Sequence, residues 1–524
     1  MLFADLAAAS RTVAGTPARS AKVAVVADVL RGADPDEVAV AVAYLAGELR
    51  QRRTGLGWAS LRDLPAPAAD ATLGVSEVDA TFGRLAGLSG PGSQAERRRV
   101  LADLLGRATE PEQALLRGLV AGELRQGALE GVMIEAVARA AAVPAATVRR
   151  AVMLTGAVAQ VAQAALDGGA AALTAFGLQV GRPVQPMLAA SAPDVAQALA
   201  QVGSAVVEWK LDGIRVQMHR AGEQVTVFTR TLEDISAQVP EVVAAVRALS
   251  VQAVVLDGEV LALNPQGRPM PFQVTASRVS TRTDQGQRAE VPLSLFVFDL
   301  LHLDGRDFLD APLLERQDAL AAIVPVALQV PRLVADDVGT AQAFAMDALA
   351  RGHEGVVVKS LDAPYAAGRR GSSWVKVKPV HTLDLVVLAV EWGSGHRRDW
   401  LSNLHLGARD PDSPGGFVML GKTFKGLTDD MLRWQTDALL ALANDPVAAR
   451  DSWVVHVRPE LVVEIAFDGV QTSTRYPGGM ALRFARVLRY RPDKAADQAD
   501  DVTAVRAVHL GSAADQPAEV RLGG

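Results

Sequence analysis

The feature that most constrains the fold is a change of hydrophobic period near residue 180. Before it, apolar residues recur every three or four positions, as at Val100, Leu101 and Leu104, which predicts helices. After it, apolar residues form short runs between glycines, prolines and polar turns, a pattern typical of strands. A chain of 524 residues is too long for one core, so the change of period predicts separate domains.

Two proline-containing segments, 181–189 and 378–384, mark the predicted domain boundaries. Between them, runs such as VVEWKLDGIRVQMHR and LSLFVFDLLHL, with a few helical stretches, predict an α+β domain with antiparallel sheets. Beyond Asp384, short strands with little helix between them predict a small β-barrel. The polar stretch after Lys494 is expected to pack loosely. The expected divisions are a helical domain at 1–180, an α+β domain at 181–380, a barrel domain at 381–512 and a tail at 513–524.

The composition excludes several classes of protein. The chain has no cysteine, so disulfides, cysteine-ligated zinc and iron–sulfur clusters are excluded, and any metal must be held by carboxylates, histidines or a substrate. The formal net charge of −6 argues against a surface that is basic throughout, but it permits a locally basic cleft. The N-terminus has no basic segment and carries Asp5 within its apolar stretch, and no apolar run of about 18 residues occurs. We therefore expect a cytoplasmic protein without a membrane segment.

One lysine in the middle region stands in a setting that favours chemistry. Lys210 ends an apolar run and is followed by Asp212, a glycine and Arg215. An ammonium that is removed from water and placed near other cations loses its proton more readily and becomes a nucleophile. A lone lysine is usually a solvated surface cation, so this interpretation depends on the groups that accompany it.

Further segments in the same region supply such groups. Glu259 in LDGEV and Glu354 in EGVVVK are carboxylates that suit a hard cation such as Mg²⁺, which also contacts phosphate. Phe298 in FVFD could stack on a purine, although a single aromatic residue at such a position more commonly belongs to the core. Lys376 and Lys378 are two positions apart and share one face of a predicted strand, where they could bind a triphosphate or simply face solvent.

The order of the segments KLDGIR, FTR, LDGEV, FVFD, EGVVVK and WVKVK resembles that of the nucleotidyltransferase superfamily of ATP-dependent DNA ligases and mRNA-capping enzymes. The resemblance implies that Lys210 is the catalytic residue and receives AMP on its side-chain nitrogen. It also implies that Glu259 and Glu354 hold a metal, Mg²⁺ or in its place Mn²⁺. The residues that it assigns to ATP binding in this domain are Glu208, Arg215, Arg230, Glu259, Phe298, Arg370, Lys376 and Lys378.

The basic run RYPGGMALRFARVLRYRPDK at 475–494 resembles the last motif of this family, which is carried by an OB-fold that closes over the β and γ phosphates. The resemblance assigns Arg491 and Lys494 to the departing pyrophosphate. An OB-fold agrees with the β-barrel that the strand pattern predicts. NAD-dependent ligases carry a four-cysteine zinc module, and this chain has no cysteine, so ATP is the expected donor.

The segments GELRQGALEG at 122–131 and YLAGELRQRRTGLGWASL at 44–61 resemble the DNA-binding domain of stand-alone ATP-dependent ligases, the second in its bacterial branch. The resemblance implies a monomer that seals nicks in double-stranded DNA through lysine-AMP and 5′-adenylated DNA. RNA guanylyl transfer, RNA ligation and a non-catalytic DNA-binding protein remain alternatives at this point, although the RNA enzymes lack such a domain. The residues expected to approach the DNA backbone are Arg52, Arg53, Arg125 and Gln126.

Overall fold

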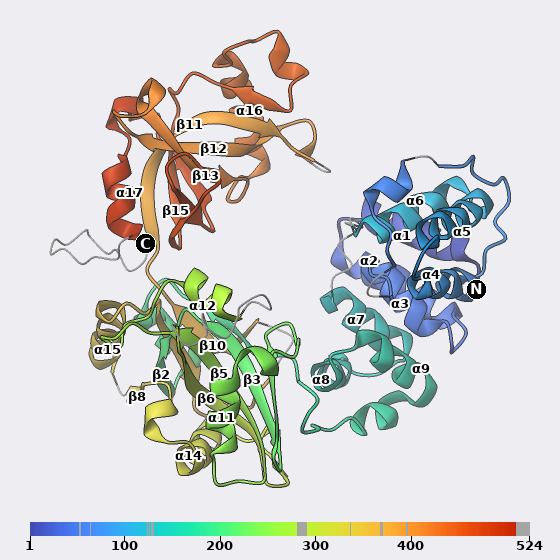
Figure 1. Cartoon of the computed structure of the whole chain (residues 1–524), viewed down its shortest axis with the longest axis horizontal. Helices are drawn as coiled ribbons and strands as arrows, with labels where there is room; N and C mark the ends of the chain where they lie inside the picture. The colour runs from blue at the N-terminus through green and yellow to red at the C-terminus, as the bar shows by residue number, and fades with distance from the viewer. Residues whose placement is uncertain are drawn as a thin grey trace.

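The computed structural model describes residues 1–509 except 52, 53, 63, 123, 125, 127–129, 280–290, 336, 367–369, 395 and 396. Figure 1 shows a helical region on one side and two sheet-containing domains on the other. In the described part of the chain, none of the helices combines the length and apolarity needed to cross a bilayer. The predicted fold class, a helical N-terminal part, an α+β middle domain and a β-rich OB-type C-terminal part, is confirmed.

The helical region is built on the three-and-four spacing of its apolar residues. Phe3, Tyr44 and Phe82 lie in its core with rings edge to face, at centroid distances of 6.1 and 6.5 Å. Thr109 begins one helix, and its N–H donates to the Glu112 carboxylate at 2.8 Å in a capping box. The helices are α1 (Phe3–Gly15), α2 (Arg19–Gly32), α3 (Val38–Ala46), α4 (Val75–Gly87), α5 (Ser93–Arg107), α6 (Glu110–Ala121), α7 (Glu130–Ala140), α8 (Ala145–Thr155) and α9 (Val158–Thr174).

Two sheets form the middle domain, with strand orders β1-β10-β9-β2-β8 and β4-β3-β5-β6-β7. β1 runs parallel to β10, and the other described ladders of these sheets are antiparallel, as expected. The strands are β1 (Leu188–Ser191), β2 (Ala205–Lys210), β3 (Ile214–Ala221), β4 (Gln224–Thr229), β5 (Ala253–Ala262), β6 (Leu293–Leu303), β7 (Arg306–Asp307), β8 (Arg332–Ala335), β9 (Gly355–Ser360) and β10 (Arg370–Val377). The helices include α10 (Val195–Val202), α11 (Pro240–Arg247), α12 (Phe272–Val279), α14 (Leu313–Ile323) and α15 (Val338–Ala350).

The C-terminal domain has a main sheet of order β13-β12-β11-β15-β18, with β14 beside β11 and a separate hairpin of β16 and β17. Its strands are β11 (His381–Trp392), β12 (Leu401–Arg409), β13 (Phe417–Thr423), β14 (Val454–His456), β15 (Val462–Phe467), β16 (Gly469–Thr472), β17 (Met480–Arg483) and β18 (Arg486–Tyr490). The domain also contains α16 (Asp429–Ala441) and α17 (Val502–His509), so it holds more helix than the sequence predicted.

The stretch after Lys494 does not pack loosely, and that expectation is wrong as far as His509. Val505 on α17 is fully buried in the core of the C-terminal domain. The Asp500 N–H donates to the Asp384 carbonyl at 2.8 Å, which fastens the segment before α17 to the first strand of the domain. Apolar burial at three-residue spacing therefore outweighs the polar composition of the stretch. The expected tail, 513–524, lies outside the described residues.

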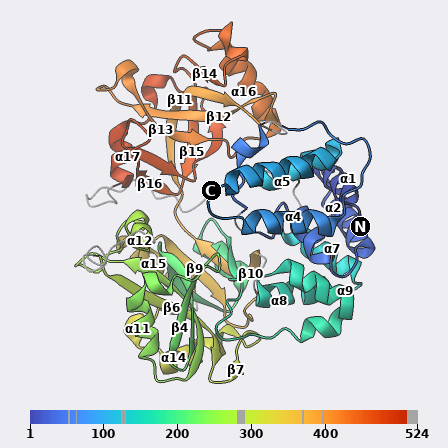
Figure 2. The ribbon, with the colours of Figure 1, turned by 45° about the vertical axis from the view of Figure 1, so that its right-hand side comes forward.

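Helix α8 joins the helical region to the middle domain, and Figure 2 shows it beside β10. Arg150 donates hydrogen bonds of 2.6 and 2.7 Å to the Asp310 carboxylate. Met153 and Leu154, on the same helix, are buried in a cluster that also contains Tyr365. The helical region is therefore packed directly against residues of the middle domain.

We predict that the buried pair of Arg316 and Asp299 is critical for stability. Both side chains are fully buried, and they form hydrogen bonds of 2.7 and 3.1 Å. Arg316→Leu leaves a buried carboxylate without its counter-ion, so the free energy of unfolding should fall by about 3 to 5 kcal/mol in urea denaturation. Arg433→Ala breaks an exposed pair with Asp430 and should cost less than about 1 kcal/mol. Equal losses in the two variants would contradict this prediction.

Candidate active site

Lys210 lies at the end of β2, where this strand pairs with β9. The Glu354 N–H donates to the Lys210 carbonyl at 3.0 Å, and the Lys210 ammonium contacts the Glu354 carboxylate. Gly355 follows with φ of 137°, and a Cβ at that position would lie 2.3 Å from the Val377 carbonyl oxygen. A glycine is therefore required at the start of β9, and it allows the preceding carboxylate to reach the lysine.

Glu259, on β5, faces the turn that follows Lys210. The Gly213 N–H donates to Glu259 Oε1 at 3.2 Å. A Cβ on Gly213 would lie 2.4 Å from the Val260 carbonyl oxygen, so only glycine lets the turn approach β5 this closely. Burial raises the pKa of Glu259 to about 7, although the positive charges of Lys210 and Arg215 oppose the rise. The structure thus gathers Lys210 and the carboxylates expected beside it.

Arg215, on β3, is held by protein groups. Its guanidinium donates to both carboxylate oxygens of Asp257, at 3.0 and 2.6 Å, and to the Met187 carbonyl at 2.6 Å. The Tyr365 hydroxyl donates to the same Asp257 carboxylate at 2.8 Å. Burial lowers the pKa of Arg215, but the Asp257 charge outweighs it and leaves this pKa above its ordinary value. The family resemblance assigns Arg215 to ATP binding, and the structure shows how the side chain is fixed in place.

Glu208 lies two residues before Lys210 on the same face of β2, and its side chain is buried. Its carboxylate contacts the Lys359 ammonium and accepts a hydrogen bond of 2.9 Å from the Gln317 amide. Burial raises the pKa of Glu208, and Lys359 opposes the rise. Lys359 Nζ also lies 4.5 Å from the ring centroid of Phe298 and 4.2 Å from that of Trp374. Phe298, the expected purine-stacking residue, is therefore next to Glu208 in space.

The motifs LDGEV and EGVVVK contain Asp257 and Lys359, but the ion pairs of these residues with Arg215 and Glu208 were not predicted. No role was predicted for Gln317 or Tyr365. Asp257 precedes Glu259 by two positions and shares its strand face, so the motif itself places the two carboxylates together. Gln317 and Tyr365 come from segments far along the chain, and no local pattern marks them.

The other residues expected at the phosphates occupy different surroundings. Arg230 is exposed just after β4 and lines a small pocket together with Arg215. Lys376 is half-buried on β10. Lys378, on the same side of the chain, donates to Asp468 of the C-terminal domain at 2.5 Å. The side chain of Arg370 lies outside the described part of the structure.

Arg491 and Lys494, the residues expected at the pyrophosphate, lie in the C-terminal domain beside Asp384. Their charged groups are 3.0 and 2.5 Å from Asp384 Oδ2. Arg491 also pairs with Asp493, whose pKa it lowers to about 2 by hydrogen bonding. Asp384 and Asp493 both belong to the C-terminal domain, so the structure does not bring the two cations together with Lys210.

A different arginine of the C-terminal domain reaches the site. Arg483, at the end of β17, donates to Asp212 of the lysine motif at 2.8 Å, and this hydrogen bond raises the pKa of Arg483. The Gln273 amide donates to the Thr472 carbonyl at 3.0 Å in the same interface. Arg483 belongs to the basic run at 475–494, but its contact with Asp212 was not predicted from the sequence.

The residues expected at DNA can be placed only in part. Arg52, Arg53 and Arg125 lie outside the described residues. Gln126 is buried, with its amide oxygen accepting from the Ser10 hydroxyl at 2.5 Å and its amide nitrogen donating to the Leu45 carbonyl. This interior position differs from the surface contact that we expected.

Comparisons with known proteins agree with this architecture. The model of the ATP dependent DNA ligase domain matches residues 186–378, that of the ATP dependent DNA ligase C terminal region matches 397–494, and that of the DNA ligase N terminus matches 65–138. The Probable DNA ligase of Beutenbergia cavernae is 60% identical, over 97% of this chain and 99% of its own. The Probable DNA ligase of Mycolicibacterium gilvum is 59% identical over similar shares. The solved structure Pmar-Lig_PreS3, with a TM-score of 0.58 and 19% identity, covers 93% of this chain and 99% of that chain, and shares the fold.

A helical N-terminal region, a lysine-bearing two-sheet domain and an OB-type domain define a polynucleotide ligase that works through a nucleotide. The chain belongs to the ATP-dependent DNA ligases, and it seals nicks in DNA with ATP as its substrate. The family and the activity that the sequence predicted are therefore confirmed. RNA guanylyl transfer, RNA ligation and a non-catalytic role are set aside.

The raised pKa of Glu259 predicts a dependence of stability on pH. A carboxyl whose pKa rises on folding, here from 4.5 to about 7, stabilises the fold below the lower value and loses that contribution as pH rises through 7. Glu259→Gln carries no charge to bury. The difference in free energy of unfolding between Glu259→Gln and the wild type should therefore shift in favour of the variant by about 3 kcal/mol between about pH 5 and pH 8. Urea titrations at each pH measure this difference. A constant difference across this range would contradict the prediction.

Proposed function

We propose that Lys210 is the residue that receives AMP from ATP. The observation that carries this proposal is the position of its ammonium, at a strand end between Glu354 and the turn that faces Glu259. For the reaction, the amine must first lose its proton and then attack the α-phosphorus. A nitrogen–phosphorus bond forms, and the oxygen–phosphorus bond to pyrophosphate breaks. In-line displacement of this kind requires positioning and neutralisation of charge more than acid–base chemistry.

Two further displacements complete the reaction that we propose. The AMP passes from Lys210 to the 5′-phosphate at the nick, which regenerates the lysine. The 3′-hydroxyl then attacks that phosphate, the phosphodiester bond forms, and AMP leaves. Glu208 and Phe298 would face the adenine, since both border one buried cluster of charge and aromatic rings. The groups that we propose at ribose and phosphate are Arg215, Arg230, Glu259, Arg370, Lys376 and Lys378.

Glu259 and Glu354 are the residues that we propose for metal binding. Among the described residues, no cluster of three or more acidic or histidine side chains could hold a metal by itself. Two carboxylates near Lys210 nevertheless fit Mg²⁺, which is commonly bound by one or two carboxylates together with phosphate oxygens of the substrate. Mg²⁺, or Mn²⁺ in its place, would neutralise the charge that develops on the phosphate oxygens.

The C-terminal domain supplies the proposed lid. Arg491 and Lys494 would contact the departing pyrophosphate, yet in this structure Asp384 accepts both. The lid must therefore turn about the segment 378–384 to bring these cations to ATP, and turn again to admit DNA. The contact between Arg483 and Asp212 supports an arrangement in which a different face of the domain borders the site.

We further propose that the protein acts as a monomer on nicked duplex DNA in the bacterial cytoplasm. Its helical region would hold the DNA backbone, with Arg52, Arg53 and Arg125 as the proposed contacts. The extents 1–180, 181–380 and 381–512 remain our proposed domains, with 513–524 as a tail. The packing of α8 on the middle domain supports a helical region that positions DNA beside the site.

Lys210→Ala should abolish enzyme–AMP formation, with a loss on the order of 10³-fold or more, because no nucleophile remains. Lys210→Arg should fail as well, since a guanidinium stays protonated. Labelled ATP followed by acid precipitation measures the adduct, and circular dichroism checks the fold. Sealing by either folded variant with ATP as the donor would exclude Lys210 as the acceptor.

Glu354→Gln and Glu259→Gln should raise the Mg²⁺ concentration needed for half-maximal enzyme–AMP formation, because each removes a proposed ligand. Added Mn²⁺ should restore part of the rate. Glu315→Gln, at a carboxylate paired with Arg306 away from the site, is the matched control and should leave the metal titration unchanged. If all three variants show the same metal dependence as the wild type, Glu259 and Glu354 do not act through metal.

The double variant Arg491→Ala and Lys494→Ala should lower enzyme–AMP formation by about 10²-fold or more, because the leaving pyrophosphate loses its cations. Sealing of a pre-adenylated nick, which releases no pyrophosphate, should be affected far less. By contrast, Arg52→Ala and Arg125→Ala should leave enzyme–AMP formation intact and weaken nick binding further as salt rises. Equal loss of both steps in the folded lid variant would refute this division of roles.

A further inference from the structure

Trp209 and His353 immediately precede Lys210 and Glu354 in the chain, and their rings stack with centroids 4.7 Å apart and planes inclined by 34°. Successive side chains of a strand point to opposite faces, so the Trp209 indole lies on the face of β2 opposite to the Lys210 ammonium. The proposed catalytic pair therefore occupies one face, and the stacked rings of its chain neighbours occupy the other.

The end of α15 delivers His353 to this place. Gly352 has φ of 90°, and the His353 N–H donates to the Ala348 carbonyl at 3.0 Å, which is the hydrogen bond of a Schellman turn. The chain therefore reverses direction after the helix. His353 arrives against Trp209, and the next residue, Glu354, donates its N–H to the Lys210 carbonyl.

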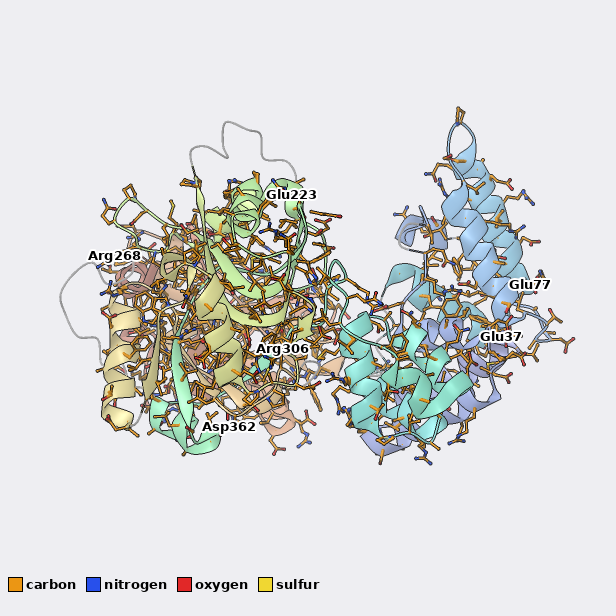
Figure 3. All side chains as sticks on the ribbon, turned by 90° about the horizontal axis from the view of Figure 1, so that it is seen from below. Glu37, Glu77, Glu223, Arg268, Arg306 and Asp362 are labelled. Atoms are coloured by element: carbon orange, nitrogen blue, oxygen red, sulfur yellow. The ribbon has the colours of Figure 1, made fainter. Side chains whose placement is uncertain are left out.

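Few other groups hold the two stacked rings in place. Phe344 of α15 is the other aromatic neighbour of Trp209, at 6.2 Å, and the Arg351 guanidinium lies 5.4 Å over the indole. Outside them is a hollow of about 360 Å³ lined by Trp209, His353, Arg268 and Arg351, among others. Figure 3 shows Arg268 on the side of the middle domain away from the helical region. The side of the stacked rings that faces this hollow is therefore not fully covered by protein atoms.

The two rings also carry polar atoms that the fold does not satisfy. His353 is 7% exposed, and within the described chain neither its Nδ1 nor the Trp209 Nε1 has a hydrogen-bond partner. A buried polar atom without a partner lowers stability. Two such atoms in one contact are not explained by a contribution to stability alone.

We propose that Trp209 and His353 are positioning residues for adenylation: their stacked rings fix the chain before Glu354 against the end of β2, and so hold the Glu354 carboxylate at Lys210. This inference rests on the proposed roles of Lys210 and Glu354. The stack acts on the geometry of the nucleophile and its partner, and it makes no contact with the nucleotide. Because displacement needs close alignment, a small shift of Glu354 slows the chemical step without changing the affinity for ATP.

The test compares His353→Ala, which removes the ring, with His353→Phe, which keeps a ring and removes both nitrogens. Single-turnover formation of enzyme–AMP from labelled ATP gives the maximal rate and the ATP concentration for half-maximal rate. We expect His353→Ala to lower the maximal rate by about 10- to 100-fold, with the half-maximal ATP concentration within about twofold of the wild type. His353→Phe should retain the rate within about threefold.

Phe344→Ala is the matched control, because it removes the other aromatic neighbour of Trp209 without touching the segment before Glu354. It should lower the melting temperature at least as much as His353→Ala while leaving the maximal rate within about threefold. The proposal is overturned if Phe344→Ala slows adenylation as much as His353→Ala, if His353→Phe is as slow as the alanine variant, or if the change is mainly in the ATP concentration. Lys210→Ala serves as a blank: label on that variant would refute the proposed function itself, independently of the stack.

Discussion

The site depends on one ion pair, between the Lys210 ammonium at the end of β2 and the Glu354 carboxylate before β9. A lysine at the end of a buried strand loses much of its hydration, so a carboxylate must lie close to it. The backbone hydrogen bond between the same two residues gives the pair its geometry. The glycine that follows Glu354 is needed because β9 passes close to the Val377 carbonyl.

Around this pair, the middle domain buries further charges, and three of them are held in ion pairs. Asp257 holds Arg215, Glu208 contacts Lys359, and Asp299 holds Arg316. Such pairs contribute little net stability compared with apolar packing, but losing one member leaves a buried charge and is costly. Their effect is to fix the orientation of carboxylates and guanidinium groups in the region where we propose that phosphates and a purine are recognised.

The three parts of the chain are joined by contacts of different kinds. The helical region is fixed by apolar packing of α8 as well as by Arg150. The contacts of the C-terminal domain with the middle domain include two ion pairs, of Lys378 with Asp468 and of Arg483 with Asp212, and the hydrogen bond from Gln273 to Thr472. Partly exposed ion pairs of this kind are weak, so they can break and be replaced by other pairs. Separating a buried apolar cluster exposes its surface to water and costs more free energy. This difference agrees with a fixed helical region and a C-terminal domain that turns.

The sequence by itself determined the spacing of apolar residues in each region, and this spacing shows which face of a helix or strand is buried. The helical, α+β and β-rich parts could therefore be predicted from it. It also determined the motif order from which the ligase family could be recognised. Only the tertiary structure decided that Gln126 is an interior residue, that α17 packs into the last core, and that Arg483 rather than Arg491 meets the lysine motif. Partners such as these are set by how distant segments meet, and local spacing carries no information about that meeting.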